Sequence, residues 1–478
     1  MAEEVLDEWT VKASNILNIS LVTKAEQGRP KTIASFRPTW TYPIVNNDEE
    51  TIYGYKGLKI SLRFNASDMR PHISHTSTKR VPATVAIAES PEIRDLFEPF
   101  LPPVAFGKAA DFEVAVQNSS DEWHPPGELV ETFQGDTEDL YEVWRGNLAD
   151  PLVLALVKRI QILVSLFIEA GTPIQTESTE DAEADFLDRW TVFFLYQKQP
   201  RANEPGKYTY VFVGYSTVYR FFIFRPQTPD GGATGDLELP TKTTPFSDFP
   251  CRSRISQFVI LPPFQHKGNG QRLYRPIFKT LLDDPNTFEI TVEDPSEAFD
   301  TLRDMADLAF LREKSDFNEI RINTSVTLSK NGFVLSNIVD KKVLETVRTK
   351  YKIASRQFSR LVEMHLMSKL PDSVLTKLED AVQGKVKKAA TKAEEHEYRL
   401  WKLVTKSRIA AQNKEQLSAL NLDERVTKLN ETLNSVELEY ALLLSMFEQR
   451  KDAHSKTDGK KRKAEEEAEA SSSKKSKA

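Results

Sequence analysis

The sequence predicts a mixed fold of the α+β or α/β class, in which a mixed amino-terminal domain and a central α/β domain precede a helical carboxy-terminal domain. Alternating apolar and polar runs, such as residues 57–64, are typical of strands and occur in the first two thirds of the chain. Between residues 254 and 293, a strand, a glycine-bearing loop, a helix and a second strand follow one another. From about residue 340 to 450, Leu, Ala, Lys, Glu and Gln dominate at helical spacing.

Length and composition limit the kinds of protein that this chain can be. It has 478 residues, 40% of them hydrophobic and 28% charged, which indicates globular domains with sizeable cores. Its single cysteine, Cys251, excludes an internal disulfide framework, and its seven histidines form no HExxH pair, so we expect no metal site. The amino terminus lacks the apolar core of a secretory signal, and Lys158 and Arg159 interrupt the most apolar stretch, so a soluble, intracellular protein without a membrane span is expected.

The charge distribution separates the last twenty residues from the rest. The net charge is -6, but residues 459–478 contribute about +3, which leaves about -9 on the remainder. This basic tail has a composition typical of disorder, and its clusters at 460–463 and 474–477 resemble a bipartite nuclear localisation signal; a solubilising tail is the alternative. Direct nucleic-acid binding is not expected of such an acidic body. We predict four segments: 1–145, 146–335, 336–455 and 456–478.

The elements of the central segment are predicted in order from periodicity and from Pro and Gly punctuation. We expect a helix near 151–170, strands at 190–197, 208–214 and 216–224, a mobile loop over 226–250, a strand at 254–261, a helix at 271–282, a strand at 288–293 and a helix starting at 294–297. Farther on, Pro371 ends one helix and Asp372-Ser373 caps the next. Residues 417–447 form either a protruding arm, a partner-binding helix or part of the local bundle.

The loop Gln265-His-Lys-Gly-Asn-Gly270 lies between an apolar strand and a helix. Unpaired N–H groups at the start of that helix would favour an anion, Gly268 and Gly270 would allow close approach of the backbone, and Lys267 could add positive charge. The spacing matches neither GxxxxGK[ST] nor GxGxxG, which disfavours a P-loop or a Rossmann site. A tight strand–helix turn without a ligand remains an alternative.

Longer strings make a family resemblance specific. QxxGxG between a strand and a helix resembles the acetyl-CoA pyrophosphate loop of the GNAT acetyltransferases. SQFVILPPFQHKGNG, followed by ITVEDPSEAFDTLRD, resembles the fungal members of the family of type B histone acetyltransferase catalytic subunits. Further matching strings lie at 48–60, 167–170, 213–219 and 350–367, so the resemblance covers most of residues 35–370. It implies a GNAT core and an acetyl-CoA-dependent enzyme.

The implied reaction is direct acetyl transfer to a lysine ε-amine. Because a lysine ammonium has a pKa of about 10.4, it must lose a proton before it attacks, and a carboxylate near other carboxylates, with its pKa raised by burial, suits this task. The resemblance assigns the base to Glu293, with Glu169 and Asp294 at the family's other acidic positions. From the residues alone, Asp294 could simply cap a helix together with Pro295 and Glu297, while Glu169 and Glu293 could be solvated. A covalent route through Cys251 is not expected.

The resemblance also assigns residues to acetyl-CoA. A strand would pair its backbone with the pantetheine arm, the following loop and helix start would hold the pyrophosphate, and one serine would lie near the thiol. These residues are Phe258, Val259, Ile260, Gln265, His266, Lys267, Gly268, Asn269, Gly270, Gln271 and Ser296. A plain core strand is the alternative for the first three, and positions 266 and 267 vary within the family.

The implied acceptor is the tail of free, newly made histone H-four, with other free histones as further possibilities. An acidic protein body would steer such a basic tail toward its groove. The residues at the family's histone-contact positions are Asp48, Glu49, Glu50, Trp190, Tyr219, Arg220 and Phe221. The alternatives are a solvated acidic turn and aromatic core residues.

The resemblance further implies a WD-repeat β-propeller histone-binding partner, a cytoplasmic and nuclear location, and roles in DNA repair and telomeric silencing. The segments 172–188 and 227–251 are longer than we expect for the family and could alter access to the groove. Two other functions remain possible from the sequence: a non-catalytic histone-binding subunit that retains the fold, and a GNAT enzyme for another amine.

Overall fold

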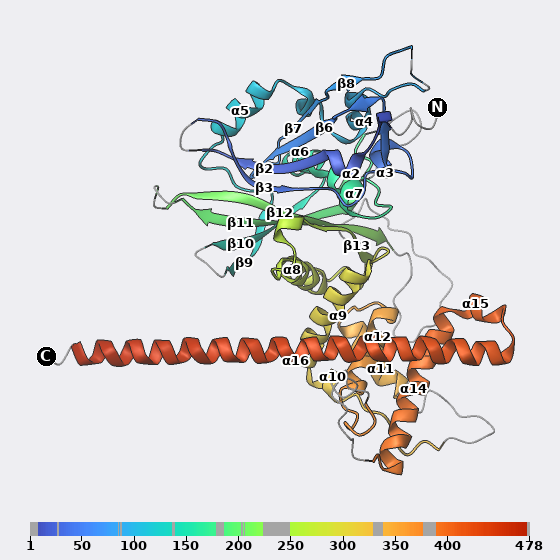
Figure 1. Ribbon diagram of the computed structural model, residues 1–478. Helices are drawn as coiled ribbons and strands as arrows, with labels where there is room; N and C mark the ends of the chain where they lie inside the picture. The colour runs from blue at the N-terminus through green and yellow to red at the C-terminus, as the bar shows by residue number, and fades with distance from the viewer. Residues whose placement is uncertain are drawn as a thin grey trace, which may run out of the picture. The chain divides into compact units, whose positions relative to one another are not determined.

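A computed structural model describes residues 8–25, 28–84, 86, 88–135, 139–177, 186–201, 204, 206–222, 249–327, 338–375 and 389–475, with side chains as far as residue 449. By its internal contacts the chain divides into two compact units, Met1–Asp294 and Pro295–Ala478 (Figure 1). The predicted amino-terminal segment and the strands of the central segment therefore fall within one unit. The mixed fold with a helical carboxy-terminal part is confirmed.

The first unit begins with a four-stranded sheet of order β3-β2-β6-β7, in which β2 and β6 are parallel and the other pairs antiparallel. Its strands are β2 Leu17–Thr23, β3 Lys31–Phe36, β6 Lys59–Asn65 and β7 Pro71–Thr76. Two short pairs flank it, β1 Thr10–Lys12 with β4 Thr51–Tyr53 and β5 Tyr55–Lys56 with β8 Lys79–Arg80. Short helices are α2 Ala13–Ile16, α3 Tyr42–Val45, α4 Ile93–Phe97, η1 Glu98–Phe100, η2 Pro103–Phe106 and α5 Ala109–Gln117. The predicted strand near 57–64 is confirmed as β6.

A six-stranded sheet of order β14-β13-β12-β11-β10-β9 forms the rest of this unit. Its strands are β9 Glu128–Gln134, β10 Leu140–Asn147, β11 Trp190–Pro200, β12 Tyr208–Phe222, β13 Cys251–Ile260 and β14 Thr287–Val292. All neighbours are antiparallel except β13 and β14, which are parallel. The prediction of two strands across residues 208–224 is wrong, since β12 is continuous. Gly214 lies inside β12 because a Cβ there would overlap the carbonyl oxygen of Val259 on β13.

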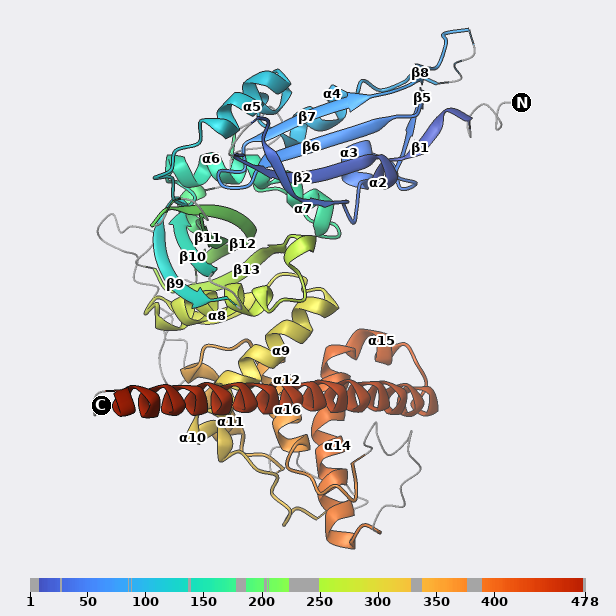
Figure 2. The same cartoon turned by 60° about the vertical axis from the view of Figure 1, so that its left-hand side comes forward.

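Helices cover both faces of the six-stranded sheet (Figures 1 and 2). The helix α8, Asn269–Asp283, packs on one face and contacts every strand of the sheet. On the other face lie α6, Pro151–Ile160, and α7, Ile162–Phe167, which share a buried core with the four-stranded sheet. Asp150 caps α6, because its carboxylate accepts hydrogen bonds from the N–H groups of Leu152 and Val153. The single helix predicted near 151–170 is thus two helices, divided at Gln161.

The second unit is helical. Its helices are α9 Glu297–Arg312, α10 Ser315–Asn318, α11 Lys341–Lys350, α12 Ser355–Met367, α14 Lys392–Gln412, α15 Lys414–Ser418 and α16 Leu422–Lys475. Buried Leu433, Tyr440 and Leu443 of α16 pack with α12 and α14, so the middle of this helix is part of the local bundle. The backbone of α16 runs on to Lys475 through most of the segment predicted to be disordered, in keeping with the helix propensity of its Ala, Glu and Lys residues. The helix expected after Asp372-Ser373 and the loop over 226–250 lie largely outside the described residues.

The alternative in which Asp294 caps the next helix does not hold in the structure. α9 begins at Glu297, and its N-cap is Ser296, whose hydroxyl accepts a hydrogen bond from the N–H of Phe299 at 3.3 Å. Asp294 instead has a φ of 32°, a left-handed conformation that aspartate tolerates better than most residues. Within the part of the chain that the structure describes, no helix is long and apolar enough to cross a membrane.

Candidate active site

A fork between β13 and β14 is the central feature of the candidate site. The two strands pair only as far as Ile255 and Val292, and the N–H of Glu293 then donates to the Ile255 carbonyl oxygen at 2.9 Å. β13 continues to Ile260, so among the described residues its last part has no neighbouring strand on the β14 side. An open strand edge of this kind offers backbone hydrogen bonds to an extended polar ligand, as the two amides of a pantetheine arm require.

The strand residues predicted to meet acetyl-CoA lie along this open edge. Val259 is buried in the core, whereas Phe258 and Ile260 are half-buried. The Val259 side chain is therefore part of the core, as the alternative to a cofactor role proposed. Pairing of the strand backbone with the pantetheine arm is compatible with this burial. A register shift opposite Ser216 and Val218 places a bulge at Ser256 and Gln257, where the fork opens.

The predicted pyrophosphate loop follows at the end of the same strand. Residues 265–268 are largely exposed, and Gly268 adopts a φ of 76° immediately before the first turn of α8. This left-handed conformation suits glycine and turns the first N–H groups of the helix outward. No side chain of the described residues caps α8, so these groups can meet an anion. Gln265 donates to the carbonyl of Ile260 at 2.8 Å, which fixes the loop to the end of β13.

Lys267 does not extend freely over the loop. Its ammonium donates to the carbonyl of Pro263 at 2.9 Å, and Arg272 reaches back to the Lys267 carbonyl at 2.6 Å. Asn269 is buried and its amide donates to the carbonyl of Phe264 at 2.9 Å. The loop is therefore built mainly by side chain to backbone hydrogen bonds. His266 also adopts a positive φ, of 59°.

Glu293 stands at the fork with an environment that differs from the predicted one. Its side chain is 45% exposed, its carboxylate accepts a hydrogen bond from the Ser256 hydroxyl, and Arg254 lies 3.6 Å away. The expected setting was a buried carboxylate beside other carboxylates. In this structure the polar neighbours are instead a hydroxyl and a cation, both from β13.

Glu169 follows α7, on a different element from Glu293, and is exposed. Two contacts fix the chain around it: the N–H of Ala170 donates to the Tyr42 hydroxyl at 2.7 Å, and the Thr172 carbonyl accepts from the Gln257 amide at 2.9 Å. Gln257 lies at the bulge next to Ser256, so the segment after Glu169 is attached beside the fork. Burial raises the pKa of the Tyr215 phenol well above its ordinary value, and this neutral phenol donates to Gln257 at 3.4 Å.

An aromatic row lies on the sheet face opposite α8. Trp190 and Tyr219 are paired across β11 and β12, with ring centroids 4.8 Å apart, and the Phe221 ring lies 4.7 Å from that of Tyr219. Arg254 is opposite Tyr219 on β13 and stacks over Phe221 at 4.2 Å. Three predicted groove residues and the partner of Glu293 therefore share one face.

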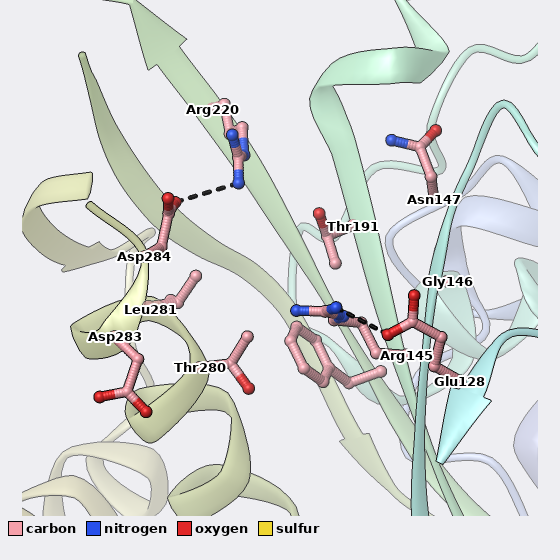
Figure 3. Close-up of a pocket in the computed structure, with 11 residues that line it drawn as sticks. Glu128, Arg145, Gly146, Asn147, Thr191, Arg220, Thr280, Leu281, Asp283 and Asp284 are labelled. Carbon is pink, nitrogen blue, oxygen red and sulfur yellow. Dashed lines mark hydrogen bonds and ion pairs between the residues drawn. The ribbon is translucent and has the colours of Figure 1, made fainter. Parts of the chain in front are cut away.

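Arg220 is not part of this row. Because side chains alternate along a strand, it points to the α8 face, where it pairs with Asp284 at 3.0 Å (Figure 3). A cavity of about 580 Å³ opens there, and Arg145 with its partner Glu128, Thr191 and Asp283 also line it. Arg220 therefore lies on the opposite face of the sheet from Tyr219 and Phe221, although all three were predicted to line one groove.

The acidic turn at 48–50 has a mixed character. Asp48 and Glu49 are both exposed. The Glu50 side chain is only 12% exposed, and its carboxylate accepts from the N–H of Thr41 at 2.7 Å and of Tyr42 at 3.3 Å. Glu50 therefore holds the start of α3 and is not free to meet a basic tail. Since the Tyr42 hydroxyl also accepts from Ala170, the turn is connected to the segment around Glu169.

Several residues of the site have no counterpart among the predictions. Arg254 and Ser256 contact Glu293, Gln257 anchors Thr172, and Arg189 donates to the Tyr219 hydroxyl at 3.1 Å. A signal for the first two existed, because Arg252, Arg254 and Ser256 occupy every second position of the strand and therefore share one face. Nothing local in the sequence marks Gln257 or Arg189.

Comparison with known proteins agrees with this architecture. The family model described as the N-terminus of histone acetyl transferase HAT1 matches residues 9–169, and that of the C-terminal part of fungal HAT1 matches residues 304–371. A relative from Pyricularia oryzae, named histone acetyltransferase type B catalytic subunit, is 46% identical over 99% of both chains. A protein of the same name from Gibberella zeae is 47% identical over 92% of this chain and 91% of its own. One from Yarrowia lipolytica is 35% identical over 92% and 93%.

The six-stranded sheet, its fork and the loop before α8 define a GNAT-type acetyltransferase core. The chain belongs to the family of histone acetyltransferase type B catalytic subunits. The family resemblance read from the sequence, and the classification as an enzyme, are thereby confirmed.

Proposed function

We propose that the protein transfers the acetyl group of acetyl-CoA directly to lysine ε-amines in the tail of free, newly made histone H-four. The observation that carries this proposal is the fork, where an open strand edge begins beside a carboxylate, together with the helix start that follows the far end of the same strand and has no side-chain cap among the described residues. The same residues suit a long thioester that is extended and amide-bearing at one end and anionic at the other.

For acetyl-CoA, the backbone of residues 258–260 would pair with the pantetheine amides. The segment from Gln265 to Gln271 would hold the pyrophosphate at the positive end of α8. The thioester supplies an electrophilic carbonyl carbon and a thiolate leaving group. Ser296 caps α9 through its oxygen and keeps its O–H as a donor; its assignment to the region of the thiol rests on the family resemblance.

For the acceptor, the lysine ammonium must give up a proton, and Glu293 takes it. The amine nitrogen then attacks the carbonyl carbon, a C–N bond forms and the C–S bond breaks. The nitrogen releases its second proton as the amide forms, and the departing thiolate of coenzyme A takes up one proton. Arg254 and Ser256 hold the carboxylate at the fork before the lysine arrives. Glu169, Asp294, Asp48 and Glu49 keep the approach acidic, which suits a basic tail.

The partner and the compartment are part of the same proposal. A WD-repeat β-propeller subunit would present the histone, and the relatives' name, catalytic subunit, fits an enzyme that works with another chain. The protein would act in the cytoplasm and nucleus, with the basic tail as the import signal. The net negative charge of the chain supports a basic protein as substrate.

The decisive experiment is transfer of labelled acetyl-CoA to core histones, either free or assembled into nucleosomes, with mass spectrometry of the products. We expect labelling of histone H-four tail lysines in the free histones and little labelling of nucleosomes. Spermidine and unrelated basic peptides serve as competitors in the same assay. A preference for nucleosomes, or for a small amine, would contradict the proposal.

A further inference from the structure

The side chain of Arg189 stabilises the end of the β11–β12 ladder. It closes the 3₁₀ turn η3, Leu187–Arg189, directly before Trp190, which forms the last ladder pair with Tyr219. Its guanidinium donates to the Tyr219 hydroxyl at 3.1 Å and stacks over the rings of Phe186 at 4.7 Å and Phe222 at 5.0 Å. Two aromatic faces and one phenol therefore fix a single cation.

This contact determines what the Tyr219 hydroxyl can do. A guanidinium has only donors, so the phenol oxygen is the acceptor in this hydrogen bond. The O–H of Tyr219 then remains available as a donor to another group. The ring itself cannot easily turn away, because it packs against Trp190 on one side and Phe221 on the other.

We infer that Arg189 is a positioning residue that aims the Tyr219 hydroxyl at a main-chain carbonyl oxygen of the acceptor polypeptide. This inference rests on the proposed function, since it takes the aromatic row as the groove for that polypeptide. A lysine ammonium offers only donors and cannot satisfy the O–H, whereas every peptide carbonyl can. The contact would favour an extended polypeptide over a small amine, which has no such carbonyl.

The test compares four variants, Tyr219→Phe, Arg189→Met, Arg189→Lys and the Tyr219→Phe/Arg189→Met double variant, in steady-state assays with a histone-tail peptide and acetyl-CoA. Loss of one hydrogen bond should raise the KM for the peptide roughly threefold to tenfold in Tyr219→Phe and in Arg189→Met. The kcat and the KM for acetyl-CoA should stay within about twofold. Arg189→Lys, which keeps a donor and a stacked cation, should restore most of the affinity.

Two features make the result specific. The double variant should be about as weak as Tyr219→Phe alone, because both changes remove one contact. Replacement of a single backbone amide of the peptide by an ester gives a weaker carbonyl acceptor at that position. At one position, the ester peptide should bind the wild type less tightly than the parent peptide does, whereas the Tyr219→Phe variant should bind the two peptides equally. Arg145→Met, on the other face of the same sheet, is the matched control and should behave as wild type.

An unchanged peptide KM in Tyr219→Phe, a multiplicative effect in the double variant, or a loss confined to kcat would each overturn the inference. If Arg189→Met does not fold, as thermal unfolding would show, Tyr219→Phe and the ester peptides still decide it. A wild type that fails to acetylate histones at all would instead overturn the proposed function. The two failures are therefore distinguishable.

Discussion

The guanidinium of Arg254 lies 3.6 Å from the carboxylate of Glu293, on the strand next to it. Arg254 stacks on Phe221 at the same time, so one side chain connects the fork with the aromatic row. An incoming lysine would meet a carboxylate that already has a cationic neighbour. In the proposed mechanism, the substrate ammonium would therefore compete with Arg254 for the Glu293 carboxylate.

Replacement of Glu293 by Gln should remove the proton acceptor and keep the shape of the fork. We expect kcat to fall by roughly 10²–10⁴-fold, as for the loss of a general base, with the acetyl-CoA dissociation constant nearly unchanged. Initial rates with labelled acetyl-CoA and titration calorimetry would measure the two quantities. Glu289→Gln is the control, since Glu289 lies on β14, just before Glu293 in the chain, and pairs with Arg252. Full activity of the Glu293→Gln variant would remove this residue from the base role.

Replacement of Gly268 by Ala should weaken acetyl-CoA binding. A left-handed backbone costs an alanine about 1–2 kcal/mol, so the loop should move and the dissociation constant should rise roughly tenfold. Gly206→Ala is a matched control, because Gly206 has a φ of 85° in a turn between β11 and β12, with open space around it. Calorimetric titration of both variants tests the idea. If both variants lost the same affinity for acetyl-CoA, the backbone strain would act through the stability of the whole protein and not through the loop.

Substitutions in the acidic turn should differ in their effect on stability between Glu50, which supports the fold, and Glu49, which lies on the surface. Glu50→Gln removes a charged acceptor from two N–H groups at the start of α3, so we expect a loss of about 1–2 kcal/mol in the free energy of unfolding. Glu49→Gln changes an exposed side chain and should leave stability within about 0.5 kcal/mol. Denaturant unfolding measures both. If Glu49 contacts the histone as predicted, the peptide KM of the Glu49→Gln variant should be raised at low salt. If the turn is only solvated, that KM should not change.

His365 should make the second unit sensitive to acid. Burial, reinforced by the positive charges of Arg312 and Arg321, lowers the pKa of His365 to about 4. Between this value and the ordinary value of 6.5, the unfolded chain binds a proton that the folded chain does not. Stability contributed by the neutral ring is complete above pH 6.5 and is lost as the pH falls toward 4, on the order of 3 kcal/mol in total.

Denaturant unfolding of the wild type and of His365→Phe at several pH values between 4 and 7 would test this. The variant should lose less stability than the wild type over that interval, whatever its stability at pH 7. His396→Phe, at a half-buried position in the first turns of α14, is a suitable control. Parallel pH profiles for wild type and His365→Phe would show that the ring is not the titrating group.

The strand–loop–helix–strand unit was predictable because each part has a local signal. The apolar end of β13, the two glycines before α8 and the capping residues before α9 all act over a few residues. The same locality explains the capping error: Asp294 and Ser296 are both good N-caps, and only the backbone conformation distinguishes them. Arg220 could have been separated from its neighbours by strand alternation alone.

Other features depend on pairings between distant segments. The contact of Arg254 and Ser256 with Glu293 follows from the register of β13 against β14, and it depends on where that pairing stops. Glu50 supports α3 from the far side of a turn, and Gln257 reaches Thr172 across most of the central segment. Such contacts leave no periodic trace in the sequence, so the polar surroundings of the candidate base could not be predicted.

The bond between Gln257 and Thr172 has an evolutionary consequence. The segment that leaves α7 is fastened at Gln161, which donates to the Ile174 carbonyl at 3.0 Å, and again at Gln257. The segment that follows these two hydrogen bonds in the sequence can become longer or shorter without moving Glu169 relative to β13. Insertions and deletions in that stretch should therefore leave the position of Glu169 unchanged.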